Sequence, residues 1–226
     1  MNKTRLFLLP GLGCAPGFYD STIIDLQKDW DAEEINFGVH SIEEDADIVY
    51  DRVKDCKDDF IFVAHCFSAL IVVNLLNRYE LPRLQGVVLC GSLVDFSKVP
   101  SKQIIGNPEE QDEAYKSDGV ALDKILEARS HIIAIPDVLA QMDTTLSTDY
   151  SDLAGNVKQE VLLIGSDKDG YFSEKDFEET ISKFPNGVLA VVSGARHDGI
   201  ITHTEEYSEI ISNWLDQFEG GQCIDA

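Results

Sequence analysis

The segment FIFVAHCFSAL at residues 60–70 decides the fold that we expect for this chain. Residues 60–64 form a short apolar run, typical of a strand buried on both faces of a parallel sheet. Residues 67–79 then carry apolar side chains at helical spacing. Cys66 stands between them, with the small residues Ala64 and Ser68 two positions to either side. A tight strand-to-helix turn requires small residues there. The segment therefore predicts a strand–turn–helix unit that presents the thiol of Cys66 above the sheet.

The rest of the chain alternates in the same way between short apolar runs and amphipathic stretches. We expect further strands at residues 5–9, 34–37, 86–90, 161–165 and 188–192. We expect helices at residues 18–29, 41–56, 67–79, 174–184 and 205–218. Ser41 with Glu44 three positions later fits a capping box at the start of one helix. This alternation predicts an α/β fold with a mostly parallel sheet flanked by helices.

Residues 92–156 interrupt the alternation. Acidic helical segments are expected near residues 108–117 and 120–133, and another after Pro136, without a convincing strand. We interpret this stretch as a helical lid inserted between two strands of one domain that spans residues 1–226. The alternative is a set of ordinary surface helices that gate nothing.

Composition excludes several classes of protein. The chain has 18 basic and 41 acidic residues and a net charge of −23, which repels nucleic acid and anionic lipid, so neither is expected as a partner. No apolar run reaches the ~20 residues of a membrane span. Residues 1–9 are too short to be read as a signal peptide, so we expect a buried strand there and a cytoplasmic location. Five widely spaced cysteines predict neither a disulfide framework nor a metal site.

Three candidate site segments follow expected strands. Cys66 follows the strand at 60–64, Asp167 and Asp169 follow the strand at 161–165, and His197 follows the strand at 188–192. Open parallel sheets place their ligands at these carboxyl ends. A thiol, an acid and a histidine in this order can form a catalytic triad. Taken singly, each has a plainer interpretation: a buried thiol, a solvated acidic turn and a polar surface histidine.

Two further features bear on catalysis. Ser68 is a rival nucleophile, but the bulky Leu70 follows it two positions later, and we expect it one turn inside the helix. The backbone N–H groups of Leu12, in the segment LPGLG at 9–13, and of Phe67 are expected to form an oxyanion hole. The alternative for that segment, a phosphate-binding loop, lacks the Gly-x-Gly-x-x-Gly spacing.

The sequence resembles the α/β-hydrolase superfamily over nearly its whole length. The matching pieces are LLPGLG at 8–13, AHCFSA at 64–69, LIGSDKD at 163–169 and GARH at 194–197. The resemblance implies that Asp169, not Asp167, is the acid and that His197 is the base. Cysteine replaces the usual serine, as in dienelactone hydrolases and some thioesterases, and Pro10 replaces the histidine of the oxyanion segment.

We therefore expect a hydrolase that acts on an ester, thioester or lactone. A triad of Cys66, His197 and Asp169 would form a covalent acyl-cysteine intermediate, with no cofactor and no metal. The expected partner is a small-molecule acyl substrate, free or attached to a carrier. Two alternatives stay open: an acyltransferase or cyclase with the same triad, and a non-catalytic ligand receptor on the same fold.

Overall fold

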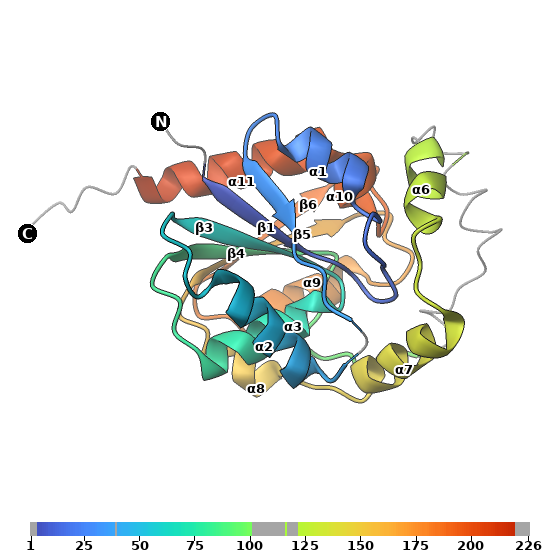
Figure 1. Cartoon of the computed structure of the whole chain (residues 1–226), viewed down its shortest axis with the longest axis horizontal. Helices are drawn as coiled ribbons and strands as arrows, with labels where there is room; N and C mark the ends of the chain where they lie inside the picture. The colour runs from blue at the N-terminus through green and yellow to red at the C-terminus, as the bar shows by residue number, and fades with distance from the viewer. Residues whose placement is uncertain (1–3, 39, 101–115, 117–121, 220–226) are drawn as a thin grey trace, which may run out of the picture.

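A six-stranded sheet forms the centre of the computed structural model, which describes residues 4–38, 40–100, 116 and 122–219. The strands run in the order β2-β1-β3-β4-β5-β6, and every neighbouring pair is parallel (Figure 1). Their bounds are β1 Arg5–Leu9, β2 Asp31–Glu34, β3 Phe60–His65, β4 Leu84–Cys90, β5 Glu160–Ser166 and β6 Gly187–Val192. All carboxyl ends therefore lie at one edge of the sheet.

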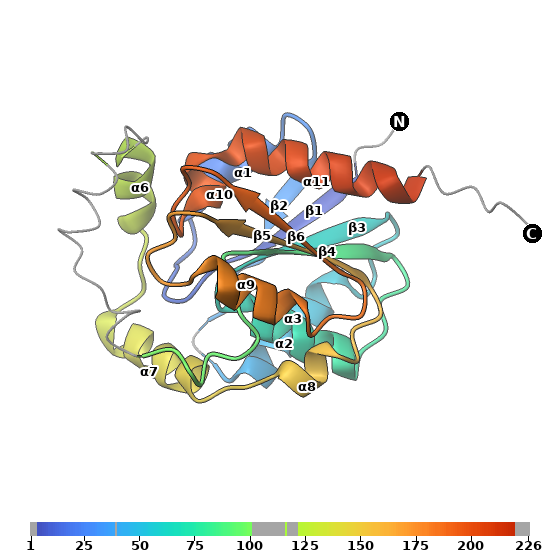
Figure 2. The same ribbon diagram turned by 180° about the vertical axis from the view of Figure 1, so that it is seen from behind.

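Helices cover both faces of the sheet (Figures 1 and 2). One face carries α1 Asp20–Leu26, α10 Gly199–Thr202 and α11 Thr204–Glu219, and the other carries α2 Ile42–Val53, α3 Ser68–Arg78, α8 Ser151–Ala154 and α9 Glu174–Ile181. Side chains along a strand alternate between two apolar clusters. In β1, Leu6 and Leu8 enter one cluster, and Phe7 and Leu9 enter the other. This burial on both faces explains the near-continuous apolar runs. The predicted α/β fold is confirmed.

Local sequence signals account for several element boundaries. The capping box predicted at the start of α2 is present, since Ser41 and Glu44 bond reciprocally to each other's backbone N–H. One strand prediction is wrong: residues 34–37 were expected, and β2 spans Asp31–Glu34. This polar edge strand pairs Arg5 with Asp31 through Leu8 with Glu34. The apolar Ile35, which suggested the later register, packs into the core just after the strand ends.

Among the described residues between β4 and β5, the two longer helices are α6 Leu122–Arg129 and α7 Ile135–Leu146. They correspond to the helices expected at 120–133 and after Pro136. The helix expected at 108–117 lies, apart from Lys116, outside the described residues. Within the described part of 92–156, pairing is limited to the isolated bridges Cys14–Ile132 and Asp95–Asp149. Figure 1 shows α6 and α7 beyond the carboxyl ends of the strands, the edge at which the site residues were predicted.

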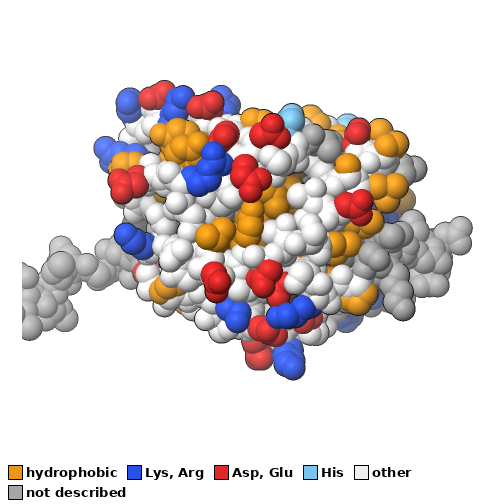
Figure 3. Space-filling view, turned by 90° about the horizontal axis from the view of Figure 1, so that it is seen from below, with side chains coloured by type: hydrophobic (Ala, Val, Ile, Leu, Met, Phe, Trp, Pro, Cys, Tyr) orange, Lys and Arg blue, Asp and Glu red, His pale blue; other side chains and the backbone are white. Residues whose placement is uncertain are grey.

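The molecular surface mixes charges. On the face that Figure 3 shows, acidic and basic side chains lie interspersed around small hydrophobic patches. Among the helices described, none is both long enough and apolar enough to span a bilayer.

Candidate active site

Cys66 occupies a strained turn between the end of β3 and the start of α3. Its φ is 52°, and it is the sole non-glycine residue with positive φ in the described part of the chain. Its amide donates to the Cys90 carbonyl at 2.9 Å, which holds the turn against the neighbouring strand. Strain of this kind costs on the order of 1–3 kcal/mol and persists where the surrounding structure enforces it. The turn has the geometry of a nucleophile elbow.

Ser68 cannot act as the nucleophile in this arrangement. It is the first residue of α3, not one turn inside the helix as expected, because the helix begins directly after the turn. Its side chain is 0% exposed, and its hydroxyl donates to the carbonyl of Pro10. The hydroxyl therefore anchors the loop after β1 and does not reach a cavity.

His197 lies in the loop of residues 193–198 that follows β6, and it is paired with Asp169. Its Nδ1 atom is 2.9 Å from Oδ2 of Asp169, and the two side chains are 11% and 0% exposed. Burial lowers the pKa of His197, but the charge of Asp169, the interaction with Cys66 and the hydrogen bond to Asp169 together raise it well above its ordinary value. The imidazole is thus set between a carboxylate and a thiol.

Asp169 is held by backbone amides as well as by the histidine. Its Oδ1 atom accepts from Tyr171 N at 2.8 Å and from Phe172 N at 3.1 Å. Burial raises the pKa of Asp169, but the charge and hydrogen bond of His197 and these two amides outweigh burial and lower it. The carboxylate therefore stays ionised although it is buried.

Asp167 turns away from the histidine. Its carboxylate accepts from Ser193 Oγ at 2.8 Å and from Gly194 N at 2.7 Å, on the exposed side of the loops. Of the two acids predicted for this segment, the structure places Asp169 against His197.

The thiol of Cys66 completes the row. Its side chain interacts electrostatically with the imidazole of His197, whose pKa it raises, and both side chains line the same cavity. Because Nδ1 is engaged by Asp169, Nε2 is the ring nitrogen that remains for the sulfur. The predicted residues Cys66, His197 and Asp169 are therefore brought together in the order thiol, imidazole, carboxylate.

The predicted oxyanion donors are the amides of Leu12, which lines the same cavity as Cys66, and of Phe67, which directly follows Cys66. Leu12 is in the loop of residues 10–19 between β1 and α1, and Phe67 is the N-cap of α3. Neighbouring amides of the loop are engaged: Gly11 N donates to Tyr19 Oη at 3.1 Å and Gly13 N to Gln141 Oε1 at 2.9 Å. Within the described residues, the Leu12 and Phe67 amides have no such acceptor.

A cavity of about 330 Å³ opens above this row. Cys66 and His197 line it, together with the charged groups Arg129 and Asp198. The remaining wall is mostly apolar and includes Leu12, Phe18, Ile132, Val138 and Phe172. The size and the apolar lining with few polar groups are those of a small-molecule site.

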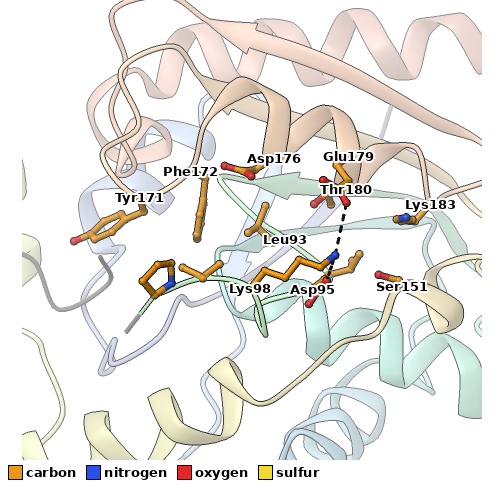
Figure 4. Close-up of a pocket in the computed structure, with 13 residues that line it drawn as sticks. Leu93, Asp95, Lys98, Ser151, Tyr171, Phe172, Asp176, Glu179, Thr180 and Lys183 are labelled. Atoms are coloured by element: carbon orange, nitrogen blue, oxygen red, sulfur yellow. Dashed lines mark ion pairs between the residues drawn. The ribbon is translucent and has the colours of Figure 1, made fainter. Parts of the chain in front are cut away.

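A second cavity of about 120 Å³ lies on the other side of Tyr171 and Phe172, which line both cavities (Figure 4). Of its two lysines, Lys98 pairs with Asp95 at 2.7 Å and with Glu179 at 3.7 Å. It holds no histidine or cysteine, so the larger cavity is the candidate reaction site. In the described ranges, no group of three or more His, Cys, Asp or Glu side chains is arranged to hold a metal ion.

Sequence reasoning missed the residues that surround the triad. Tyr171 and Phe172 pack edge-on against the His197 ring, with centroids 4.5 Å and 5.4 Å away. Their adjacency to Asp169 was the one available signal. His65 and Tyr19 also form a buried pair beside Cys66. Nothing in the sequence linked these two residues, because they lie 46 positions apart.

The sheet order, the elbow and the loop positions define the α/β-hydrolase fold. No protein-family model matches the sequence, and no curated protein matches it. Among solved structures, a lipase-esterase related protein from Clostridium acetobutylicum is similar, with a TM-score of 0.75, 15% identity, and 94% of each chain covered. A thermophilic esterase from Thermogutta terrifontis gives 0.70 at 14% identity, covering 96% of this chain and 90% of the other. MGS-M2, an α/β hydrolase from a deep-sea metagenome library, gives 0.69 at 12% identity, covering 100% and 92%. At these identities the similarity establishes the fold.

Proposed function

We propose that the chain is a hydrolase acting on an ester, thioester or lactone through a Cys66–His197–Asp169 triad and a covalent acyl-cysteine intermediate. The observation that carries the proposal is the strained turn that sets Cys66 against an imidazole already paired with a buried carboxylate. The lipase-esterase related protein and the thermophilic esterase with the same fold, at 15% and 14% identity, are consistent with an acyl substrate.

In the proposed cycle, His197 takes the proton of Cys66 through Nε2. The raised pKa of the imidazole favours keeping that proton while the sulfur attacks the acyl carbon. Asp169 holds Nδ1–H and so fixes the ring orientation and compensates the positive charge.

The sulfur–carbon bond forms, and the carbonyl oxygen becomes an oxyanion that the N–H groups of Leu12 and Phe67 stabilise. The imidazolium then protonates the leaving alcohol or thiol as its bond to carbon breaks. In the second half of the cycle, His197 takes a proton from water as the water oxygen attacks the acyl-cysteine. The sulfur–carbon bond then breaks, the acid is released, and the sulfur of Cys66 regains its proton from His197.

The helical insertion is proposed to act as a lid on the cavity. Arg129 at the end of α6, Ile132 in the following loop and Val138 in α7 line the cavity together with Cys66 and His197. The insertion is attached to the loop that carries Leu12, because Ile133 N donates to Gly13 O at 3.0 Å and Ala15 N to His131 O at 3.0 Å. A movement of this insertion would therefore change both access to Cys66 and the surroundings of the oxyanion.

The test compares Cys66→Ala with wild type on p-nitrophenyl esters, thioesters and lactones. Turnover should fall by about 10³-fold or more in the variant. Mass spectrometry of wild type should show the acyl group on the Cys66 peptide. Cys56→Ala is the matched control, since Cys56 is a partly exposed thiol whose bond is to Asp58 O, outside the cavity.

The outcomes separate the alternatives. Full activity of Cys66→Ala would exclude the thiol as nucleophile. Transfer of the acyl group to an added amine or alcohol, in preference to water, would indicate an acyltransferase. Tight ligand binding with no acylation of Cys66 and no turnover would indicate a receptor.

A further inference from the structure

A buried tyrosine hydroxyl lies beneath the loop that carries the Leu12 amide. Tyr19 is 0% exposed, and its oxygen is 3.1 Å from Gly11 N and 2.6 Å from Nδ1 of His65. The oxygen accepts the N–H of Gly11, so its own proton is available to Nδ1 of His65. Both contacts are within hydrogen-bonding distance, and the second is short.

His65 continues the chain of hydrogen bonds to the loop of His197. It is 3% exposed, and its Nε2 atom lies 3.2 Å from the carbonyl oxygen of His197. A carbonyl can only accept, so Nε2 carries the ring proton and Nδ1 is the acceptor from Tyr19. Burial, followed by the charge on His197, lowers the pKa of His65 to about 4, so the ring is neutral in this tautomer.

This series of hydrogen bonds connects three loops at the carboxyl edge of the sheet. Gly11 precedes the Leu12 amide in the loop after β1, His65 ends β3 and precedes Cys66, and His197 lies after β6. These loops hold all the groups that the proposed cycle needs apart from Asp169. Each of these hydrogen bonds has a definite donor and acceptor, so a displacement of any of the three loops would lengthen or break a buried hydrogen bond.

We propose that Tyr19 and His65 are positioning residues, which fix the oxyanion donor Leu12 and the base His197 relative to the sulfur of Cys66. The role rests on the proposed function, because it concerns groups that act only if Cys66 is acylated. Neither side chain is assigned contact with the reacting atoms.

The test separates acyl transfer from simple thiol reactivity. Acyl transfer from p-nitrophenyl acetate needs the oxyanion donors, whereas alkylation of Cys66 by iodoacetamide forms no oxyanion. In Tyr19→Phe we expect kcat to fall about 10- to 100-fold with KM within about threefold, because a displaced oxyanion donor loses much of its effect. The alkylation rate of Cys66 should stay within about threefold of wild type.

Tyr207→Phe is the matched control. Tyr207 is also buried, at 1% exposure, and its hydroxyl is 3.3 Å from Ser166 Oγ, outside the chain of bonds. Both variants should lose a few degrees of Tm, and Tyr19→Phe more than Tyr207→Phe, since the first loses two buried hydrogen bonds and the second loses one. A kcat in Tyr19→Phe within threefold of wild type would overturn the proposal, as would an equal loss in Tyr207→Phe. A parallel loss of alkylation would mean general loosening of the site and would also overturn it.

A second measurement tests the proposed hydrogen bonds of His65 even if the protein turns over no substrate. In ¹⁵N spectra of histidine-labelled wild type at about pH 7, His65 should be neutral with its proton on Nε2. A charged ring, or a proton on Nδ1, would contradict the chain of bonds. The expected tautomer without any Cys66-dependent turnover would count against the proposed function and therefore against the positioning role. The hydrogen bonds of Tyr19 and His65 would still be supported in that case.

Discussion

The imidazole of His197 and the carboxylate of Asp169 meet at 2.9 Å although they lie 28 positions apart in the chain. The pairing joins the loop after β6 to the loop after β5, two neighbouring parallel strands. Because both strands end at the same edge of the sheet, short loops suffice to bring the two side chains together. The side chain of Asp169 is 0% exposed, so bulk water cannot take its place if the pair is broken. We therefore expect the loss of this carboxylate to lower the reaction rate.

Replacing Asp169 by Asn should lower kcat by about 10²-fold or more, because an amide neither fixes the Nδ1–H tautomer of His197 nor balances its charge. Asp167→Asn is the matched control, since that carboxylate accepts from Ser193 and Gly194 and is exposed. Its kcat should stay within about threefold. Steady-state rates on one ester substrate decide the comparison, and similar losses in both variants would count against the pairing as the catalytic one.

Gly11→Ala should abolish most activity. A Cβ at position 11 would lie 2.8 Å from His65 Nδ1 and 3.3 Å from Tyr19 Oη, inside the buried hydrogen-bonded pair. The loop would have to move, and the Leu12 amide would move with it. At Gly170 a Cβ meets nothing within 4 Å, so Gly170→Ala serves as the neutral control. Rates and Tm of both variants are to be compared; an active Gly11→Ala protein would show that the loop position is not critical.

Ser68→Ala should keep at least about a tenth of the wild-type kcat, in contrast to Cys66→Ala. The hydroxyl is buried and donates to Pro10 O, so its loss leaves that carbonyl unsatisfied and costs about 1–3 kcal/mol of stability. Denaturant unfolding and ester hydrolysis measure the two effects. If Ser68→Ala were inactive while still folded, the serine would have to be reconsidered as nucleophile.

Stability should depend on pH through His65. Its folded pKa of about 4 lies below the ordinary value of 6.5, so between these values the unfolded chain binds a proton that the folded chain does not. This residue therefore makes the protein less stable as pH falls from 6.5 to 4, by roughly 3 kcal/mol at most. Burial raises the pKa of Glu34 to about 7 and that of Asp45 to about 6, which acts in the opposite direction.

The measurement is the free energy of unfolding of wild type and His65→Gln at several pH values between about 4 and 7. Glu34 and Asp45 contribute to both proteins, so the difference between the two curves reports His65 together with its coupling to His197. The variant should lose less stability than wild type on acidification. Parallel curves would mean that His65 is not buried as a neutral ring.

Features that depend on neighbouring residues could be predicted from the sequence. The elbow at Cys66 needs small residues at positions 64 and 68, and the capping box needs Ser41 and Glu44. Each feature therefore depends on residues only a few positions apart. The edge strand β2 was misplaced because a strand paired on one side requires no apolar run. Its position follows from pairing with Arg5 to Leu8, which is a contact across the fold.

The sequence alone determined that buried strands alternate with helices and that Cys66 stands in a turn too tight for larger flanking side chains, because periodicity and local sterics act over a few bonds. Only the tertiary structure decided that Asp169 faces His197 while Asp167 faces Ser193, and that Tyr19 reaches His65. Such pairings depend on the order of strands and on the exit direction of each loop. Hydrogen bonds act over about 3 Å in space, whatever the distance along the chain.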